Sequence, residues 1–271
     1  MEFIDKYQSA NQDEAHEIVD AFLREVDKES ELYKRFADPL PDGSYPKKRM
    51  YALLIKEQCR CCYCMRRLQT DGTHSSIEHV IPQHVTKEVF DEYFAYGSTL
   101  NKAYIQHEED YLKGDSQTPP YPHTVAYENI VLSCDGFYPN RGEAQSCNTK
   151  RGSDFVPPIA FVRDIHDMVE YYTNGTVRYL GKDEGLLPMV TILGLDVPIL
   201  KAIRRIWGYV TANGVNVNSC DHKELVYEIW MNCMEQLTQE ETDALLLFEK
   251  QNFWELLLQY DYFNNPSVYK V

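Results

Sequence analysis

The sequence contains no long uninterrupted run of apolar side chains. Its apolar stretches fall well short of the roughly 18 residues that a membrane-spanning helix requires. The first residues, MEFIDKYQSANQDEA, are polar and lack both the basic and the apolar region of a secretory signal. We therefore expect a cytoplasmic protein without membrane contact, in which cysteine thiols stay reduced and serve as metal ligands or core residues rather than disulfides.

Positive charge is also scarce. The chain has 27 Lys and Arg against 42 Asp and Glu, a formal net charge of −15. Because phosphate contacts need Lys and Arg, this balance argues against a protein that grips nucleic acid over a broad surface. Acidic residues are concentrated in the range 221–271. Near the cysteines the balance reverses, and we expect a small basic island there that can contact a phosphate, formed by Lys56, Arg60, Arg66 and Arg67.

Helical periodicity dominates the first half of the chain. Apolar side chains form one stripe through 11–26, and Asn11 followed by Glu14 has the pattern of a capping box, which predicts that the helix begins at Asn11. A short helix is expected over 47–58. Further helices are expected within 84–128, where the tyrosines should pack between helices. Three histidines of that stretch are expected to be solvated: His84, His107 and His123.

The second half begins with a strand pattern. In DMVEYYTNGTVRYLG, side chains alternate on both sides of Asn174-Gly175, the dipeptide that suits a tight hairpin turn, and this predicts a β-hairpin. Three helices should follow, beginning near Asp196, Asp221 and Thr238, the last two with a glutamate three residues on as a capping box. The expected fold class is α+β and mostly helical.

Four of the eight cysteines fall within six residues, CRCCYC. They form two overlapping pairs with the spacing of zinc ligands, Cys59/Cys62 and Cys61/Cys64. A distant pair, Cys134 and Cys147, can complete a tetrahedral site. The remaining two, Cys220 and Cys233, are expected to be ordinary thiols of a helical region.

A carboxylate beside a histidine, Glu78-His79, follows the cysteine cluster, and Asn129 and Asn148 come later in the chain. Together these segments, CCYC…IEHVIP…ENIVLSC…CNTKRG, resemble the motif of HNH (ββα-metal) nucleases in their four-cysteine form. The tyrosine of C-x-Y-C favours the pair Cys61/Cys64 over Cys59/Cys62. The resemblance implies a ββα core stapled by a structural zinc ion, with four thiolate ligands: Cys61, Cys64, Cys134 and Cys147.

The same resemblance implies roles for the polar residues. His79 would be the general base that takes a proton from water. Glu78 and Asn148 would hold a catalytic Mg²⁺ or Mn²⁺ ion, and Asn129 would orient His79. The basic pair that follows in the motif, Lys150 and Arg151, would supply a contact to a substrate phosphate.

The resemblance also implies a division of the chain. Residues 1–58 would be a helical lead-in, 59–154 the nuclease core with an insertion at 84–128, and 155–271 a hairpin plus a helical region that docks a partner. The order of elements is similar to PtuB-type HNH proteins, which act beside an ATPase, PtuA, in Septu and retron anti-phage systems.

This narrower likeness implies an effector that cleaves DNA or RNA and is held by an ATPase of the PtuA type. In a retron system it would also act beside a reverse transcriptase with its RNA and DNA. The acidic C-terminal part suits a protein partner better than a nucleic acid. Two alternatives remain open. One is a free-standing HNH endonuclease, and the other is a catalytically silent zinc-knuckle adaptor in a larger complex.

Overall fold

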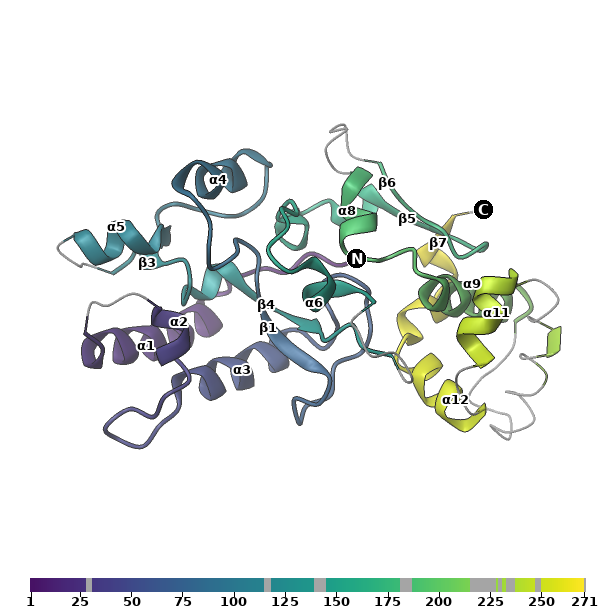
Figure 1. Ribbon diagram of the computed structural model, residues 1–271, viewed down its shortest axis with the longest axis horizontal. Helices are drawn as coiled ribbons and strands as arrows, with labels where there is room; N and C mark the ends of the chain where they lie inside the picture. The colour runs from purple at the N-terminus through teal and green to yellow at the C-terminus, as the bar shows by residue number, and fades with distance from the viewer. Residues whose placement is uncertain are drawn as a thin grey trace.

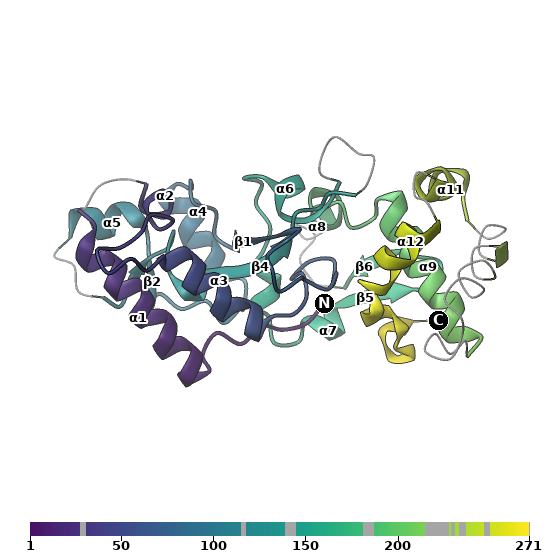
Figure 2. The same cartoon turned by 90° about the horizontal axis from the view of Figure 1, so that it is seen from below.

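The structure, a computed structural model, describes residues 1–27, 31–114, 118–138, 145–180, 187–214, 228, 231–232, 237–246 and 250–270. These residues form an α+β fold in which helices predominate and the three sheets are small. N-terminal helices and the insertion lie at one end, the C-terminal helices at the other, and a two-stranded sheet between them (Figures 1 and 2). Among the described helices none is both long and apolar enough to cross a membrane.

The N-terminal helices are α1 (Ser9–Glu25), α2 (Leu32–Arg35) and α3 (Pro46–Glu57). Helix α1 begins before the predicted capping box, so the expected start at Asn11 is wrong. The backbone N–H groups of Asn11 and Gln12 already donate to the carbonyl of Gln8. The side chain of Gln12 donates to buried Glu128 (2.7 Å), a tertiary contact that holds the first turn of the helix in place.

The central sheet pairs β1 (Ser75–His79) with β4 (Ile130–Cys134) in antiparallel register, from Ser75 opposite Cys134 to His79 opposite Ile130. A short helix, α6 (Cys147–Arg151), follows β4 and contacts it. Two antiparallel strands and one helix thus carry most of the predicted site residues. Figure 1 shows them at the centre of the molecule.

The insertion between β1 and β4 is built from short elements. They are α4 (Lys87–Glu92), η1 (Tyr93–Ala95), β2 (Ile105–Gln106), α5 (Glu108–Lys113), β3 (Tyr121–Pro122) and η2 (Tyr127–Asn129). Strands β2 and β3 pair in parallel. The insertion is joined to the lead-in through the carboxylate of Glu128, which accepts from His16 and Gln12 of α1, both at 2.7 Å.

Two histidines of the insertion are buried, so the expectation that they are solvated is wrong. His107 is 6% exposed and His123 is 1% exposed, and their rings stack with centroids 5.2 Å apart. His123 Nδ1 accepts from the Glu108 N–H (3.1 Å), and Nε2 donates to the Gln83 carbonyl (3.2 Å). The pair therefore ties the insertion to the loop that follows β1. His84 is exposed, as expected.

The C-terminal part contains η3 (Ile159–Phe161), α7 (Ile165–Met168), β5 (Val169–Tyr172), β6 (Val177–Tyr179), α8 (Leu187–Ile192), α9 (Pro198–Ala212), α11 (Gln239–Leu246), α12 (Lys250–Leu258), η5 (Asp261–Asn264), η6 (Pro266–Val268) and β7 (Tyr269–Lys270). The hairpin β5–β6 is confirmed, and β7 adds a parallel third strand. The capping box of α11 is confirmed too: Thr238 Oγ1 accepts from the Glu241 N–H (3.2 Å), and Glu241 accepts from the Thr238 N–H (3.0 Å). The helix expected at Asp221 lies outside the described residues.

The expected basic island binds the C-terminal part of the chain instead of standing free. Asp261 pairs with both Arg60 and Arg67, and buried Arg66 donates to the side chain of Gln259 (2.7 Å). The Arg67 N–H also donates to the Gln259 carbonyl (2.6 Å). Three of the four predicted basic side chains are therefore used to hold the cysteine loop against the end of α12 and the start of η5.

The burial of His123 predicts how stability depends on pH. Burial, followed by the charge of His107, lowers the pKa of His123 to about 4 from 6.5. Protonating Nδ1 would also make it a donor that faces the N–H of Glu108, so the hydrogen bond between them would be lost. The unfolded state binds more protons between these two values, so this contribution is complete above pH 6.5 and is lost as pH falls toward 4. We expect the free energy of unfolding to fall with pH, by at most about 1.4 kcal/mol per pH unit from this group.

The measurement is urea unfolding between about pH 4.5 and 6.5, comparing the wild type with His123→Gln. In the variant, the slope of the unfolding free energy against pH should correspond to the uptake of about one proton fewer on unfolding, whatever its absolute stability. His84→Gln is the matched control, because that ring is exposed, and its slope should equal that of the wild type. An unchanged slope in His123→Gln would contradict the buried, neutral state of this ring.

Candidate metal centre and active site

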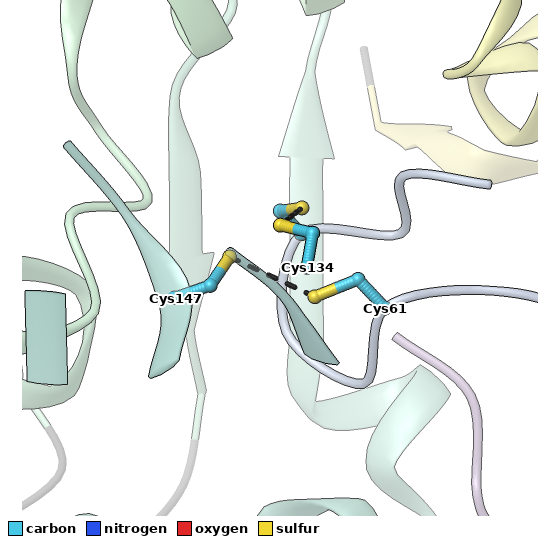
Figure 3. Close-up of side chains that lie close together, drawn as sticks. Cys61, Cys134 and Cys147 are labelled. Atoms are coloured by element: carbon cyan, nitrogen blue, oxygen red, sulfur yellow. Dashed lines mark hydrogen bonds between the residues drawn. The ribbon is translucent and has the colours of Figure 1, made fainter. Parts of the chain in front are cut away.

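The four cysteines that the motif selected come together in the structure. The sulfurs of Cys61, Cys64, Cys134 and Cys147 all lie within 4.8 Å of one another, and all four side chains are buried. Cys61 Sγ lies 3.7 Å from Cys147 Sγ, and Cys64 Sγ lies 3.6 Å from Cys134 Sγ. Figure 3 shows Cys61, Cys134 and Cys147 pointing toward one another from different parts of the chain.

Three backbone segments deliver these sulfurs. Cys61 and Cys64 lie in a tight loop in which the Cys61 N–H donates to the Arg66 carbonyl and Met65 adopts a left-handed conformation (φ 67°). The neighbouring Cys62 N–H donates to the Leu132 carbonyl of β4 (3.2 Å), which fixes the loop against the sheet. Cys134 ends β4, and Cys147 begins α6.

Two glycines permit the close packing around Cys147. Gly136 (φ 70°) and Gly194 (φ 57°) both have left-handed backbones, and a Cβ atom on either would collide with the backbone of Gln145 or Ser146. The segment that leads into Cys147 therefore packs directly against the backbone of both glycines, and any larger residue at either position would clash with it. The Leu193 carbonyl accepts from the Cys147 N–H (2.8 Å) and completes this placement.

The sulfur positions fit a tetrahedral metal ion. Four sulfurs about 2.3 Å from a zinc ion stand about 3.8 Å apart, and the separations of 3.7 Å and 3.6 Å found here are close to that value. Burial opposes ionisation of Cys61, but the thiols of Cys134 and Cys147 hold its pKa well below the usual range. Cys59 is exposed and Cys62 lies outside the cluster. A buried four-cysteine group of this kind can hold a metal ion such as zinc, with no ligand position left for water.

Glu78 occupies a buried position on β1 and is paired. Its Oε1 atom accepts from the Tyr63 hydroxyl (2.7 Å) and forms an ion pair with Arg151 of α6. Burial raises the pKa of Glu78, and Arg151 and Tyr63 oppose that shift. The Oε1 atom of this carboxylate is therefore committed to protein partners in the described arrangement.

Arg151 is buried (2% exposed), and its guanidinium is saturated with acceptors. Besides Glu78 and the Tyr63 hydroxyl, it donates to the carbonyls of His79 (2.9 Å), Val80 (2.8 Å) and Asp154 (3.1 Å) and to the Tyr93 hydroxyl (3.1 Å). No donor is left for a substrate phosphate. The predicted phosphate contact of Arg151 is therefore wrong for this structure, whereas its neighbour Lys150 is exposed.

His79 ends β1 and is held in one tautomer. Its Nε2 atom lies 2.8 Å from the Thr124 carbonyl. Because a carbonyl only accepts, Nε2 carries the proton and Nδ1 carries a lone pair, which the Gln83 amide approaches at 3.3 Å. Burial, followed by the charges of His123, Lys47 and Arg151, lowers the pKa of His79 to about 3, so the ring is neutral at physiological pH.

Asn129 is fully buried and does not contact the side chain of His79. Its Oδ1 accepts from the Ile81 N–H (2.7 Å), and its Nδ2 donates to the carbonyls of Ile81 (2.9 Å) and His123 (2.7 Å). It thus joins the loop after β1 to the residue before Thr124, which binds His79. If Asn129 orients His79, as predicted, it would do so through these two loops and not through a hydrogen bond to the ring.

Asn148 lies on α6 facing β1, where its Nδ2 donates to Ser76 Oγ (3.2 Å). Glu78, two residues along the same face of β1, is turned to Arg151 instead. The predicted Mg²⁺ ligands therefore each have a protein partner in this arrangement, and the ion at Glu78 and Asn148 stays a prediction. Among the described residues, the four cysteines are the one cluster of three or more His, Cys, Asp or Glu side chains that can hold a metal.

We expect the purified protein to carry about one zinc ion per chain, held by four thiolates. Cys61→Ser or Cys134→Ser should release the ion and destabilise the region around the sheet. Elemental analysis and thermal unfolding report the two effects. Cys59→Ser is the matched control from the same loop and should keep both zinc and stability. A preparation made without chelator that contains no zinc would contradict the site.

Arg151 and Lys150 should contribute very differently to the free energy of unfolding. Arg151→Ala leaves the Glu78 carboxylate buried without its partner, and we expect the free energy of unfolding to fall by about 3–5 kcal/mol. Lys150→Ala removes an exposed side chain next to it and should change stability by less than about 0.5 kcal/mol. Urea unfolding of both variants tests this. Equal losses would show that the buried ion pair of Arg151 with Glu78 stabilises the fold no more than an exposed lysine does.

Comparison with known proteins adds no identity to this site. Searches against protein-family models, curated proteins and solved structures find no match to the chain. The likeness to HNH nucleases therefore depends on the motif residues and on the arrangement of β1, β4 and α6 around the cysteines.

Proposed function

We propose that this chain is an HNH-type endonuclease that hydrolyses phosphodiester bonds of nucleic acid. The observation that carries the proposal is the state of His79. It ends a strand beside Glu78, it is neutral, and its protonated nitrogen is fixed on a carbonyl so that Nδ1 keeps a lone pair. The strand that carries it pairs with β4, which ends in one of the four clustered cysteines, and this supports the ββα arrangement that the resemblance implies.

His79 would act as the general base, and for this role its pKa has to rise from about 3 toward neutral pH when substrate binds, because a base that weak takes a proton from water poorly. Nδ1 takes one proton from a water molecule, the resulting hydroxide forms a bond to phosphorus, and the bond from phosphorus to the leaving oxygen breaks. The leaving oxygen takes a proton from solvent. The Gln83 amide stands where the water would bind, so it has to turn away when substrate arrives. Exposed Lys150 on α6 is the side chain that would contact a phosphate oxygen.

The two metals of the proposal have different support. The four-cysteine group fits zinc, which would fix the cysteine loop, β4 and α6 to one another without entering the chemistry. A Mg²⁺ or Mn²⁺ ion at Glu78 and Asn148 stays a prediction. It would require Glu78 to exchange Arg151 for the ion, and no step is assigned to it here.

The adaptor remains the second candidate, and one observation favours it. Glu78 is neutralised by a buried guanidinium and His79 is only 6% exposed, so both residues can be read as parts of a core that no longer binds substrate. A role beside a PtuA-type ATPase or a retron reverse transcriptase rests on the sequence resemblance alone and stays a prediction.

The test is cleavage of labelled DNA and RNA by the zinc-loaded protein with added Mg²⁺ or Mn²⁺. We expect His79→Ala to lower the rate by about 10²–10⁴-fold, because it removes the base. Zinc content and the unfolding midpoint show whether the fold survives, and His79→Gln provides a second variant of similar size. His84→Ala, an exposed histidine of the loop after β1, should cleave at the wild-type rate.

Equal cleavage by wild type and by both His79 variants would reject His79 as the base. If the zinc-loaded wild type cleaves neither DNA nor RNA with either metal, the adaptor becomes the better description.

A further inference from the structure

A groove of about 510 Å³ lies beside β1, on the side of the N-terminal helices. It is lined by Tyr33, Lys47, Lys48, Tyr51, Asp71, Gly72, Ser75, Ser76 and Ile77. In the described chain β1 pairs only with β4, so its other edge borders this groove. Of the motif segments only Ile77 lines it, none of the predicted catalytic or metal-binding residues does, and the proposed function leaves the groove without a role.

The groove carries positive charge that the described protein does not neutralise. Lys47 and Lys48 stand in the first turn of α3, where the helix dipole is unfavourable for cations, and neither makes an ion pair with a described residue. Each ammonium lies over an aromatic ring instead: Lys47 Nζ is 4.3 Å from the Tyr33 centroid, and Lys48 Nζ is 4.3 Å from that of Tyr45.

Two cations at the positive end of a helix are costly unless an anion joins them. Burial lowers the pKa of Lys47, which is the sign of a charge that lacks compensation. Among the described residues that line the groove, the one acid is Asp71, and its carboxylate already accepts from the Thr73 N–H (2.9 Å). In a chain with a net charge of −15, this is a local site for a polyanion.

The groove leads directly to the candidate base. The ring of Tyr33 packs edge-on against His79, with centroids 4.4 Å apart and planes at 88°. Lys47 is near enough for its charge to act on His79. From the other side, Ser76 lines the groove and accepts the hydrogen bond of Asn148. An anion on Lys47 would therefore lie one aromatic ring away from the proposed reaction centre.

We propose that this groove binds the nucleic-acid strand next to the cleaved phosphodiester, with Lys47 and Lys48 on two of its phosphates and the tyrosine rings against a sugar or base. The inference rests on the proposed function, because the groove gains its meaning from the reaction at His79. It assigns substrate binding to the helical lead-in. A strand held there uses two local charges and needs no broad basic surface.

The experiment measures binding apart from cleavage. The zinc-loaded full-length chain carrying His79→Ala binds a fluorescein-labelled single-stranded oligonucleotide, and anisotropy is followed as salt is raised. Adding Lys47→Ala and Lys48→Ala should weaken binding several-fold at low salt. It should also flatten the slope of log affinity against log salt by about 1.4, since each lost phosphate contact on a single strand contributes about 0.7.

The matched control removes two lysines elsewhere. Lys102→Ala with Lys113→Ala changes the net charge by the same amount, but those lysines are exposed and already paired with Asp91 and Glu109. The control should bind with nearly the slope of its parent. In the background with His79 intact, the two groove substitutions should raise KM more than they lower kcat.

The outcomes separate the two proposals. If the groove variant and the control bind alike while the wild type cleaves, the groove assignment is wrong and the nuclease stands. If the groove variant loses binding but the wild type never cleaves, the groove is a nucleic-acid site and the nuclease is wrong. If the His79→Ala parent does not bind the oligonucleotide at all, the groove assignment falls.

Discussion

A guanidinium that is buried away from water needs protein acceptors to replace its hydrogen bonds to water. Arg151 finds these acceptors on four segments of the chain. It contacts the cysteine loop through Tyr63, β1 and the following loop through Glu78, His79 and Val80, the insertion through Tyr93, and its own helix end through Asp154. An incomplete set would leave a buried charge uncompensated, at a cost of several kcal/mol. The relative placement of these four segments therefore depends on one side chain.

The cysteine group and the ion pair support each other through α6. This helix has five residues, too few to be stable on its own. It is fixed at its first residue, Cys147, by the sulfur cluster and at its last, Arg151, by the ion pair with Glu78. Asn148 lies between these two anchors and reaches Ser76. A metal ion at the cysteines would thus stabilise the position of Glu78 and His79 without approaching either.

Local patterns of the sequence predicted what local geometry determines. Asn174-Gly175 marked the hairpin, and Thr238 with Glu241 marked a helix start. Spacing alone left Cys59/Cys62 and Cys61/Cys64 open, and the resemblance, through Tyr63, selected the pair that joins the cluster. Each of these depends on residues within a few positions of one another, with the distant Cys134 and Cys147 supplied by the motif. The resemblance supplied the ordering of Glu78, His79, Asn129 and Asn148, and the structure places them on the paired strands, the turn before β4 and α6.

What the sequence missed depends on contacts between distant residues. Histidines read as solvated, His107 and His123, are buried because the insertion folds back onto the loop after β1. The sequence predicted that Arg60 and Arg67 can contact a phosphate. In the structure both pair with Asp261, which lies about two hundred residues farther along the chain. Periodicity and spacing describe neighbours along the chain, so they contain no information on these pairs. The signal for Lys47 and Lys48 was present, as two cations at a helix start, but only the groove gives it a meaning.

The acidity of the chain and a nucleic-acid substrate become compatible once the positions of the basic residues are considered. Net charge counts side chains wherever they are, yet Arg66, Arg151 and Arg204 are buried and serve the fold. Of the cations that remain, those beside the proposed site, Lys47, Lys48 and Lys150, come from two separate helices. Such an arrangement favours a short contact with substrate over a long one, because the chain as a whole carries a net charge of −15. Affinity for long nucleic acid would then be weak, and this is the physical reason for which the predicted partner protein would be needed to present the substrate.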